Sequence, residues 1–368
     1  MSSAGRRVRS RRSGPVVVTN AGTRSGAAAA RALSAESGVS VVALGTPLAP
    51  LDPDLASSSV QLVEDVDLGA PTVADHLRGA RALVHVLAPD DLAAELADGG
   101  RRDRLVREIQ TLVLSAAATS VPHLVLVTSA MVFGAKEDNP VPLDDDAVRG
   151  ADATVGLVGD LVAVEEALEH ASAIHPGLVT TLVRPATLVD GTDTIMTRHV
   201  AAPRLLRLKE STPIWQLCHV EDLASALAHV VKSHLAPAVT VASEGWLDQG
   251  EMEDLSGMRT VELGHAAATG IAQRLHRVGS LPSPATDLDY IAHPWAVSSA
   301  RLREDGWRPV HDNTECLDLL LSDARAHRMG SARRFDRKDG AAIGAASAAV
   351  AVGATAAIMR RRRKKGST

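Results

Sequence analysis

Two glycines, Gly22 and Gly26, lie between a short β-branched run and an alanine-rich stretch. In nucleotide-binding folds, glycines at such a place make a tight turn and let backbone N–H groups approach a pyrophosphate. Asn20 tolerates a left-handed backbone and can support the turn in place of a glycine. Thr23, in contrast, adds a side chain where a phosphate would sit. The pattern therefore fits a weakened dinucleotide site and a purely structural turn about equally well.

Such a turn must be held between a buried strand and a helix, and the flanking sequence predicts both. The first unit consists of strand Pro15–Asn20, helix Ala21–Leu33 and strand Val39–Gly45, about 30 residues, which is the length of a parallel crossover. Further strands are predicted at Val60–Val63, Ala82–Ala88, His123–Thr128 and Val179–Arg184, with helices at Val73–Gly79, Arg101–Thr119 and Val158–His170. This alternation predicts an α/β fold with a Rossmann-like, doubly wound parallel sheet.

After Arg184 the alternation gives way to Pro, Gly and short amphipathic pieces. This change predicts a small C-terminal substrate lobe over the carboxyl edge of the sheet, where ligands bind in such folds. We divide the chain into a basic disordered arm (1–14), a Rossmann-like core (15–185), a mixed lobe with closing helices (186–330) and a basic tail (331–368). Some segments of the third region are expected to return to the core, and 310–328 is expected to form a closing helix.

Charge is unevenly distributed along the chain. Residues 1–14 carry a net charge of +5 and residues 331–368 carry +8, whereas the whole chain is −5, so the body is near −18. An acidic body repels nucleic acid, and aromatic residues at 2% leave few stacking surfaces, so we exclude a nucleic-acid partner. Cys218 and Cys316 exclude a disulfide framework, show no metal-ligand spacing and suit a reducing cytosol. We therefore predict a cytoplasmic protein without a metal site, in which both cysteines are buried.

The tail contains an uncharged, alanine-rich stretch at 340–359, followed by six basic residues at 360–365. Twenty helical residues at ~1.5 Å each span a bilayer core. One interpretation is therefore a C-terminal transmembrane helix, or adhesion of the basic residues to an anionic membrane. Alanine and glycine insert only weakly, so the other interpretation is a soluble alanine-rich helix or a disordered tail.

Several short motifs follow one another along the chain. They are Val63–Val66 (VEDV), Leu83–Ala88 (LVHVLA), Val127–Gly134 (VTSAMVFG), Val183–Ala186 (VRPA), His219–Ala224 (HVEDLA) and Ser298–Pro309 (SSARLREDGWRP). With the turn at 20–26 they resemble, over about residues 15–325, the extended short-chain dehydrogenase/reductase superfamily, and within it the NAD-dependent epimerase/dehydratase family. Each motif alone is moderately specific, but their order makes the resemblance strong.

The resemblance implies a site at the carboxyl ends of the strands. The positions that match the family's NAD or NADP contacts are Asn20, Gly22, Thr23, Gly26, Asp65, Val66, Leu87 and Ala88. Ser129 falls on the catalytic Ser/Thr that hydrogen-bonds the reacting oxygen, and Arg184 and Pro185 lead into the substrate lobe. Gly45 stands where the family usually has an acid for the adenosine ribose, so that contact is missing. We interpret His85 as a packed, hydrogen-bonded residue.

The resemblance also shows that a catalytic pair is missing. The family moves a proton through a Tyr four residues before a Lys as hydride moves. Leu157 and Leu161 occupy these two positions, and the single tyrosine, Tyr290, is followed four residues later by Pro294. Losing acid–base help alone typically costs ~10²–10⁴ in rate. We therefore predict weak or absent binding of NAD or NADP and no hydride transfer.

Two functions remain open from these residues. The first is a degenerate family member that binds a nucleotide, a nucleotide-sugar-like ligand or a protein partner at the membrane. The alternative is an active NAD(P)-dependent sugar-nucleotide epimerase, dehydratase or reductase that uses Ser129 with altered acid–base residues. Asp152 and Asp160 are acids near the missing pair, and we interpret both as exposed surface carboxylates. A homodimer is compatible with both functions.

Overall fold

The computed structural model describes residues 14–152, 156–202, 204–277 and 285–332. Its centre is a seven-stranded parallel sheet in the order β11-β6-β5-β4-β1-β2-β3. The strands are β1 (Val16–Thr19), β2 (Val41–Leu44), β3 (Val60–Val63), β4 (Ala82–Val86), β5 (His123–Val127), β6 (Val179–Pro185) and β11 (Ala238–Val241). The strand order reverses between β1 and β4, the point at which doubly wound sheets bind ligands at the carboxyl ends of their strands.

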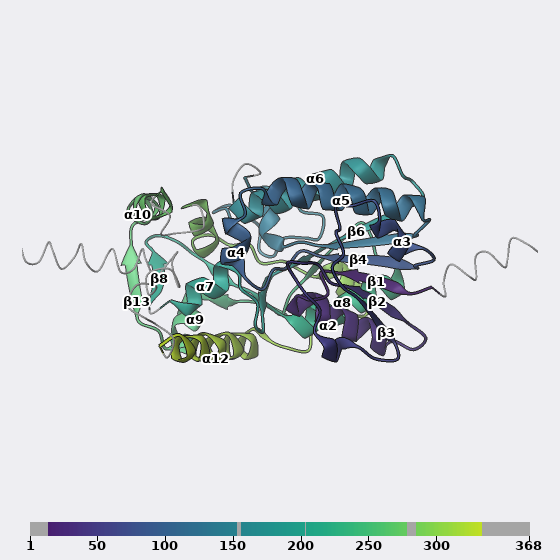
Figure 1. Ribbon diagram of the computed structural model, residues 1–368. Coiled ribbons are helices and arrows are strands. Elements are labelled where there is room, and N and C mark those ends of the chain that lie inside the picture. The colour runs from purple at the N-terminus through teal and green to yellow at the C-terminus, as the bar shows by residue number, and fades with distance from the viewer. Residues whose placement is uncertain (1–13, 153–155, 203, 278–284, 333–368) are drawn as a thin grey trace, which may run out of the picture.

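Helices cover both faces of this sheet (Figure 1). One face carries α3 (Val73–Leu77), α5 (Arg101–Ala118) and α6 (Gly156–Ala173), and the other carries α2 (Arg24–Ala35) and α8 (Val220–Ser233). Side chains alternate along each strand, so neighbouring residues enter different cores. In β1, for example, Val16 and Val18 pack with α2 and α8, whereas Val17 packs with α5 and α6. Aliphatic residues throughout suit strands that are buried on both faces.

Most of the remaining elements form a small lobe beyond the carboxyl ends of the strands (Figure 1). Its helices are α7 (Ile195–Ala201), α9 (Gln249–Ser256), α10 (His265–Arg277) and α12 (Asn313–Ala332). Three two-stranded sheets pair β7 (Thr187–Val189) with β10 (Leu217–His219), β9 (Ile214–Trp215) with β12 (Leu247–Asp248), and β8 (Leu205–Leu208) with β13 (Thr260–Leu263). Shorter pieces are α4 (Leu92–Ala97), α11 (Ala300–Glu304) and the 3₁₀ turns η1 (Pro53–Leu55), η2 (Ala130–Phe133) and η3 (Ala285–Ile291).

The predicted fold class is confirmed, because the sheet is parallel, doubly wound and covered on both faces. The strand predicted at Val60–Val63 coincides with β3, and the closing helix predicted at 310–328 is α12. The irregular stretch predicted after Arg184 also contains two regular elements, α8 and β11, which rejoin the large sheet.

The predictions for the chain ends fall largely outside the described residues. These are the basic arm up to residue 13 and the tail from residue 333, with the alanine-rich helix predicted at 340–359. Among the residues that the structure describes, no helix combines the length and apolar character needed to cross a bilayer.

Candidate cofactor and active site

Asn20 and Thr23 build the turn after β1 in place of glycines. Asn20 has a φ of 52°, in the left-handed region, and its Nδ2 donates to the carbonyl of Val86 at 2.9 Å. The Thr23 hydroxyl donates to the carbonyl of Asn20 and accepts the N–H of Gly26 at 3.1 Å, which caps α2. A helix N-terminus attracts phosphate through its unpaired N–H groups. Thr23 thus satisfies one of the groups that a phosphate would use.

The first amide of α2 is bound by an acid of the chain itself. The backbone N–H of Arg24 donates to the Asp90 carboxylate at 2.8 Å. The Arg24 guanidinium donates to the carboxylate of Asp190 at 2.7 Å and to its carbonyl at 3.2 Å, and Asp190 raises the pKa of Arg24. Asp90 follows β4 and Asp190 follows β7. The contacts therefore join the start of α2 to the segments after β4 and β7, near the point where the strand order of the large sheet reverses. A carboxylate occupies the helix end that would otherwise favour a phosphate.

Both glycines of the turn are needed for packing. A Cβ on Gly22 would lie 2.1 Å from the carbonyl oxygen of Ala49 and 2.4 Å from that of Pro50. A Cβ on Gly26 would lie 2.2 Å from the carbonyl oxygen of Asn20. Backbone atoms that close leave room only for glycine. The segment after β2 packs directly against Gly22, so both glycines are accounted for without a bound phosphate.

The end of β2 is filled by side chains from neighbouring segments. A Cβ on Gly45 would lie 2.6 Å from Oε2 of Glu64 and 2.7 Å from Cγ of Leu51, and Glu64 Oε2 accepts the N–H of Leu51 at 3.3 Å. The family usually has an acid at the end of β2, where Gly45 stands in this chain. The carboxylate that lies there belongs to Glu64, which follows β3, so spacing along the chain did not predict it. The expected contacts Asp65 and Val66 follow it, the first exposed with a φ of 56° and the second buried.

The residues at the end of β4 are part of the core. Leu87 packs with the α5 and α6 side and Ala88 with the α2 and α8 side. His85 is fully buried, and its Nδ1 lies 2.6 Å from Oγ1 of Thr19. Burial lowers the pKa of His85 to about 3, so the ring is neutral. The interpretation of His85 as a packed, hydrogen-bonded residue is confirmed.

Ser129 lies at the carboxyl end of β5, as the resemblance implies. It is half-buried, and its hydroxyl accepts the N–H of Met131 at 3.2 Å, which caps η2. The hydroxyl of its neighbour Thr128 instead points into the fold and donates to Glu165 at 2.6 Å. The two adjacent hydroxyls therefore have different roles, and that of Ser129 helps shape the turn after the strand.

Glu165 of α6 is fully buried and is bound through both of its oxygens. Oε1 accepts Nε of Arg184 at 3.1 Å besides the Thr128 hydroxyl, and Oε2 accepts Nη2 of Arg184 at 2.7 Å. Nη1 of Arg149 also lies 3.5 Å from Oε2, and the Arg184 guanidinium lies 4.9 Å from the centroid of the Phe133 ring. Arg184, expected to lead into the substrate lobe, therefore directs its charge into a buried ion pair.

A cavity of about 440 Å³ lies beside this ion pair and away from the β1–α2 turn. Arg149, Glu169 and Arg184 are among the residues that line it, and Arg149 is itself paired with Glu169 at 2.8 Å. Pro185, the other residue expected at the start of the substrate lobe, ends β6 beside Val241 of β11. Because its arginines are already paired with acids, the cavity does not indicate an anion site.

α6 carries the two leucines that the sequence resemblance matches to the family's Tyr and Lys. Leu157 packs against the core on the α2 side, and Leu161 is buried in the core on the α5 side. The interpretation of Asp160 as an exposed carboxylate is wrong: it is buried, and it accepts Nε of Arg101 and Nε of Arg102, each at 2.7 Å. Two guanidiniums compensate its burial. Asp160 cannot act as a replacement base without giving up both ion pairs.

Tyr290 is far from Ser129 in the sequence, but the fold brings it to the turn that follows Ser129. It belongs to η3, and its hydroxyl donates to the carbonyl of Met131 at 2.7 Å. Burial raises the pKa of Tyr290, and the nearby Asp287 and Asp289 add to this effect. The family's tyrosine has a pKa that its lysine lowers, so Tyr290 has the opposite property. Its hydroxyl proton is engaged by the backbone carbonyl of Met131.

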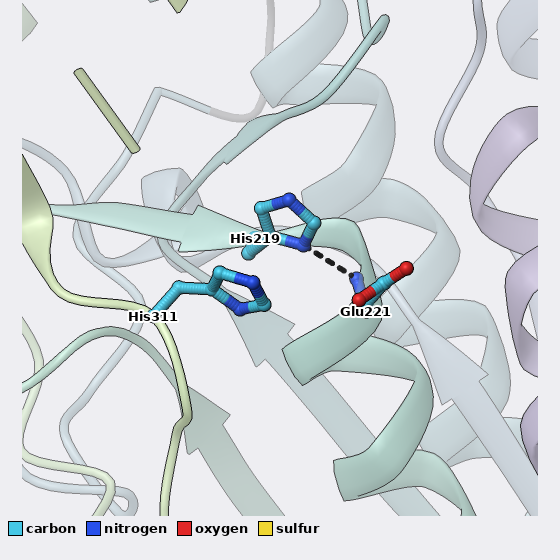
Figure 2. A group of neighbouring side chains, drawn as sticks. All are labelled: His219, Glu221 and His311. Carbon is cyan, nitrogen blue, oxygen red and sulfur yellow. Dashed lines mark hydrogen bonds between the residues drawn. The ribbon is translucent and has the colours of Figure 1, made fainter. Parts of the chain in front are cut away.

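A pair of stacked histidines lies where β10 meets α8 (Figure 2). The rings of His219 and His311 are 3.8 Å apart at their centroids and inclined by 14°, with Glu221 beside them. His219 Nδ1 accepts the N–H of Glu221 at 3.1 Å and caps α8, while His311 Nδ1 lies 3.2 Å from the Asp222 carboxylate. A ring nitrogen that accepts a backbone N–H carries no proton. His219 therefore acts as a helix cap through an unprotonated Nδ1, and burial lowers its pKa in the same sense.

Comparison with known proteins gives a fold but no sequence relative. No protein-family model matches the sequence, and neither does any curated protein. Among solved structures, MoeE5 in complex with UDP-glucuronic acid and NAD superposes with a TM-score of 0.63 at 17% identity, over 85% of this chain and 100% of that one. DesIV, a dTDP-glucose 4,6-dehydratase from Streptomyces venezuelae solved as a double mutant with NAD bound, gives 0.64 at 16% identity, over 86% and 98%. The chain has the fold of these sugar-nucleotide enzymes.

A third structure with this fold is the UDP-glucose 4-epimerase of Thermotoga maritima with UDP-glucose, at a TM-score of 0.61 and 12% identity over 85% of this chain and 99% of that one. Within the shared fold, the expected cofactor positions do lie at the carboxyl ends of β1, β3 and β4. Sequence reasoning missed Asp90 and Asp190, the acids that meet at Arg24. No sequence motif links these two acids, because they are distant in the chain and only the fold brings their loops together.

Proposed function

We propose that this chain is a degenerate protein of the epimerase/dehydratase fold, which binds a nucleotide, a nucleotide-sugar-like ligand or a protein partner without transferring hydride. The observation that carries the proposal is the pairing of Arg24 with Asp90 and Asp190, which puts the chain's own carboxylates at the start of α2. Leu157 and Leu161 support it independently, since neither can hold a ribose or move a proton.

The residues present fit a dinucleotide poorly. A pyrophosphate is anionic, and at the start of α2 it would meet Asp90 and Asp190, with Arg24 as their shared counter-charge. At the end of β2, the carboxylate of Glu64 is engaged by a backbone N–H, and Gly45 has no side chain to offer a ribose. MoeE5 and DesIV are solved with NAD. The proposed difference from such proteins lies in the side chains and not in the fold.

Calorimetric titration with NAD is expected to give a Kd weaker than 1 μM, a binding free energy less favourable than about −8 kcal/mol. Asp90→Ala frees the Arg24 amide and removes a negative charge, so it is expected to tighten NAD binding at least about tenfold. Asp75→Ala removes an exposed acid of α3 and is the matched control, with unchanged affinity. Submicromolar binding by the unaltered chain, with no gain in Asp90→Ala, would contradict the proposal.

Turnover assays address the catalytic half of the proposal separately. With NAD or NADP and common nucleotide sugars, no epimerase, dehydratase or dehydrogenase product is expected, because the acid–base pair is absent. Product formation that Ser129→Ala abolishes would instead establish the alternative, an active enzyme with altered acid–base residues.

We further propose that the tail brings the protein to an anionic membrane. Residues 360–365 are all basic, and each can contribute about 1 kcal/mol near an anionic leaflet. In co-sedimentation with anionic vesicles at low salt, the full chain is expected to pellet and a chain that ends at Ser331 to remain in the supernatant. Equal behaviour of the two chains would exclude this role of the tail.

A further inference from the structure

A second group of metal-ligand side chains lies in the small lobe, on other elements than the stacked pair of Figure 2. His265 begins α10, Asp289 lies in η3 and His293 follows it, and their ligand atoms are within 4.8 Å of one another. His265 Nε2 is 3.5 Å from Asp289 Oδ1, and the two imidazole rings are 6.4 Å apart at their centroids. α10 contacts η3 at this place, on the outer end of the lobe (Figure 1).

The backbone fixes two of the three ligands relative to each other. The N–H of His293 donates to the carbonyl of Asp289 at 2.9 Å, so the two side chains leave one turn of chain in an i, i+4 relation. Residues at this spacing lie on one side of a turn. The third ligand, His265, comes from another helix, so the three side chains converge from two segments.

We propose that His265, Asp289 and His293 form a binding site for a divalent transition-metal ion, and that zinc is the ion it takes. Two imidazoles and one carboxylate are donors that Zn²⁺ binds, and three protein ligands leave a fourth position for water. The Thr269 hydroxyl lies 3.5 Å from His265 Nδ1, where it can orient the ring so that Nε2 faces the ion. The site is half-exposed, which gives an ion a path to it.

The distances require only a small adjustment. Zinc bonds to N and O are about 2.0–2.2 Å long, so tetrahedral ligand atoms lie roughly 3.4 Å from each other. His265 and Asp289 already meet this distance, at 3.5 Å. The ligand atom of His293 lies within 4.8 Å of the other two, so its ring has to approach by at most about 1.4 Å, which a rotation of a partly exposed side chain provides.

The stacked pair at β10 is less suited to the same ion. There His219 Nδ1 accepts the backbone N–H of Glu221, so at neutral pH the proton sits on Nε2 and neither nitrogen has a free lone pair. A metal would have to displace the cap of α8. Both clusters contain two histidines and one acid, but the cluster at α10 can bind an ion without breaking a helix cap.

A bound ion would connect the lobe to the neighbourhood of Ser129. It would join α10 to η3, and η3 is held to η2 by the hydrogen bond from the Tyr290 hydroxyl to the carbonyl of Met131. Zinc is therefore expected to order the outer part of the lobe. Ions that bind only the folded state also raise its stability by mass action.

The test is titration of the full chain with Zn²⁺ alone, followed by calorimetry and by the thermal unfolding midpoint. We expect one equivalent of zinc and a raised Tm. His293→Ala and Asp289→Asn are each expected to weaken binding at least about 100-fold and to abolish the Tm shift. Both positions are partly exposed, so the metal-free variants should keep the unfolding midpoint of the unaltered chain.

Two further variants locate the ion. His170→Ala removes an exposed histidine of α6, and His311→Ala removes one of the stacked pair; both are expected to bind zinc as the unaltered chain does. The proposal is overturned if no stoichiometric zinc binds, if binding survives in His293→Ala and Asp289→Asn, or if it is lost in His311→Ala, which would place the ion at β10.

Discussion

Glu165→Leu is expected to lower the free energy of unfolding by about 3–5 kcal/mol, because it leaves the buried Arg184 guanidinium without its counter-charge. Arg184 is only 5% exposed at its side chain, and Glu165 is its bidentate partner. The change also removes the acceptor of the Thr128 hydroxyl. Urea unfolding at pH 7 measures the loss.

Two companion variants separate the ion pair from general packing. Glu169→Gln removes the charge of Glu169, the outer partner of Arg149. The Glu169 side chain is 51% exposed, so the loss of this ion pair is expected to lower the free energy of unfolding by less than about 1 kcal/mol. The double variant Glu165→Leu/Arg184→Met removes both buried charges and is expected to recover much of the loss. If the double variant is at least as unstable as Glu165→Leu alone, the unpaired charge is not the cause.

The sheet could be predicted because its physical signal is local. A strand covered by helices on both faces is a nearly continuous apolar run, and the fully buried strands β1, β4 and β5 lie within the runs predicted at Pro15–Asn20, Ala82–Ala88 and His123–Thr128. The signal is weaker where polar residues interrupt it. α8 starts with a histidine cap and two acids, so its apolar stripe was not separated from the irregular pieces around it.

The positions of the site could be predicted, but the partners of its side chains could not. Asp160 looks like a surface acid in sequence, yet its partner Arg101 is 59 residues away on the neighbouring helix. Asp90 and Asp190 approach Arg24 only because β4 and β7 end near the start of α2. Ionic contacts between loops depend on the order of the strands in the sheet, and the spacing of residues along the chain does not determine that order.

Acid is expected to destabilise the folded chain, chiefly through three buried histidines. Burial lowers the pKa of His85 and His199 to about 3 and that of His123 to about 4. The unfolded chain takes up these protons near pH 6.5. Between pH 6.5 and 4 the unfolded state therefore binds more protons than the native state, and stability falls as the pH falls. Together, the three histidines lower the free energy of unfolding by about 5 kcal/mol between pH 7 and pH 5.

One buried carboxyl acts in the opposite direction. Burial raises the pKa of Glu108 to about 7, so its contribution to stability grows as the pH falls from 7 towards 4.5. It offsets about 2 kcal/mol of the loss between pH 7 and pH 5. A net loss of about 3 kcal/mol is expected, measured as the free energy of unfolding in urea at successive pH values.

His199 allows a single proton to be followed. Its ring stacks on Trp215 with centroids 5.4 Å apart, and neither ring nitrogen has a hydrogen-bond partner among the described residues. His199→Leu therefore removes a proton site without breaking a hydrogen bond, and it should reduce the slope of stability against pH by about 1.2 kcal/mol per unit between pH 6 and 4.5. The exposed His170→Leu should leave that slope unchanged. Because a slope does not depend on the overall stability of a variant, an unchanged slope in His199→Leu would mean that His199 already binds its proton in the native state.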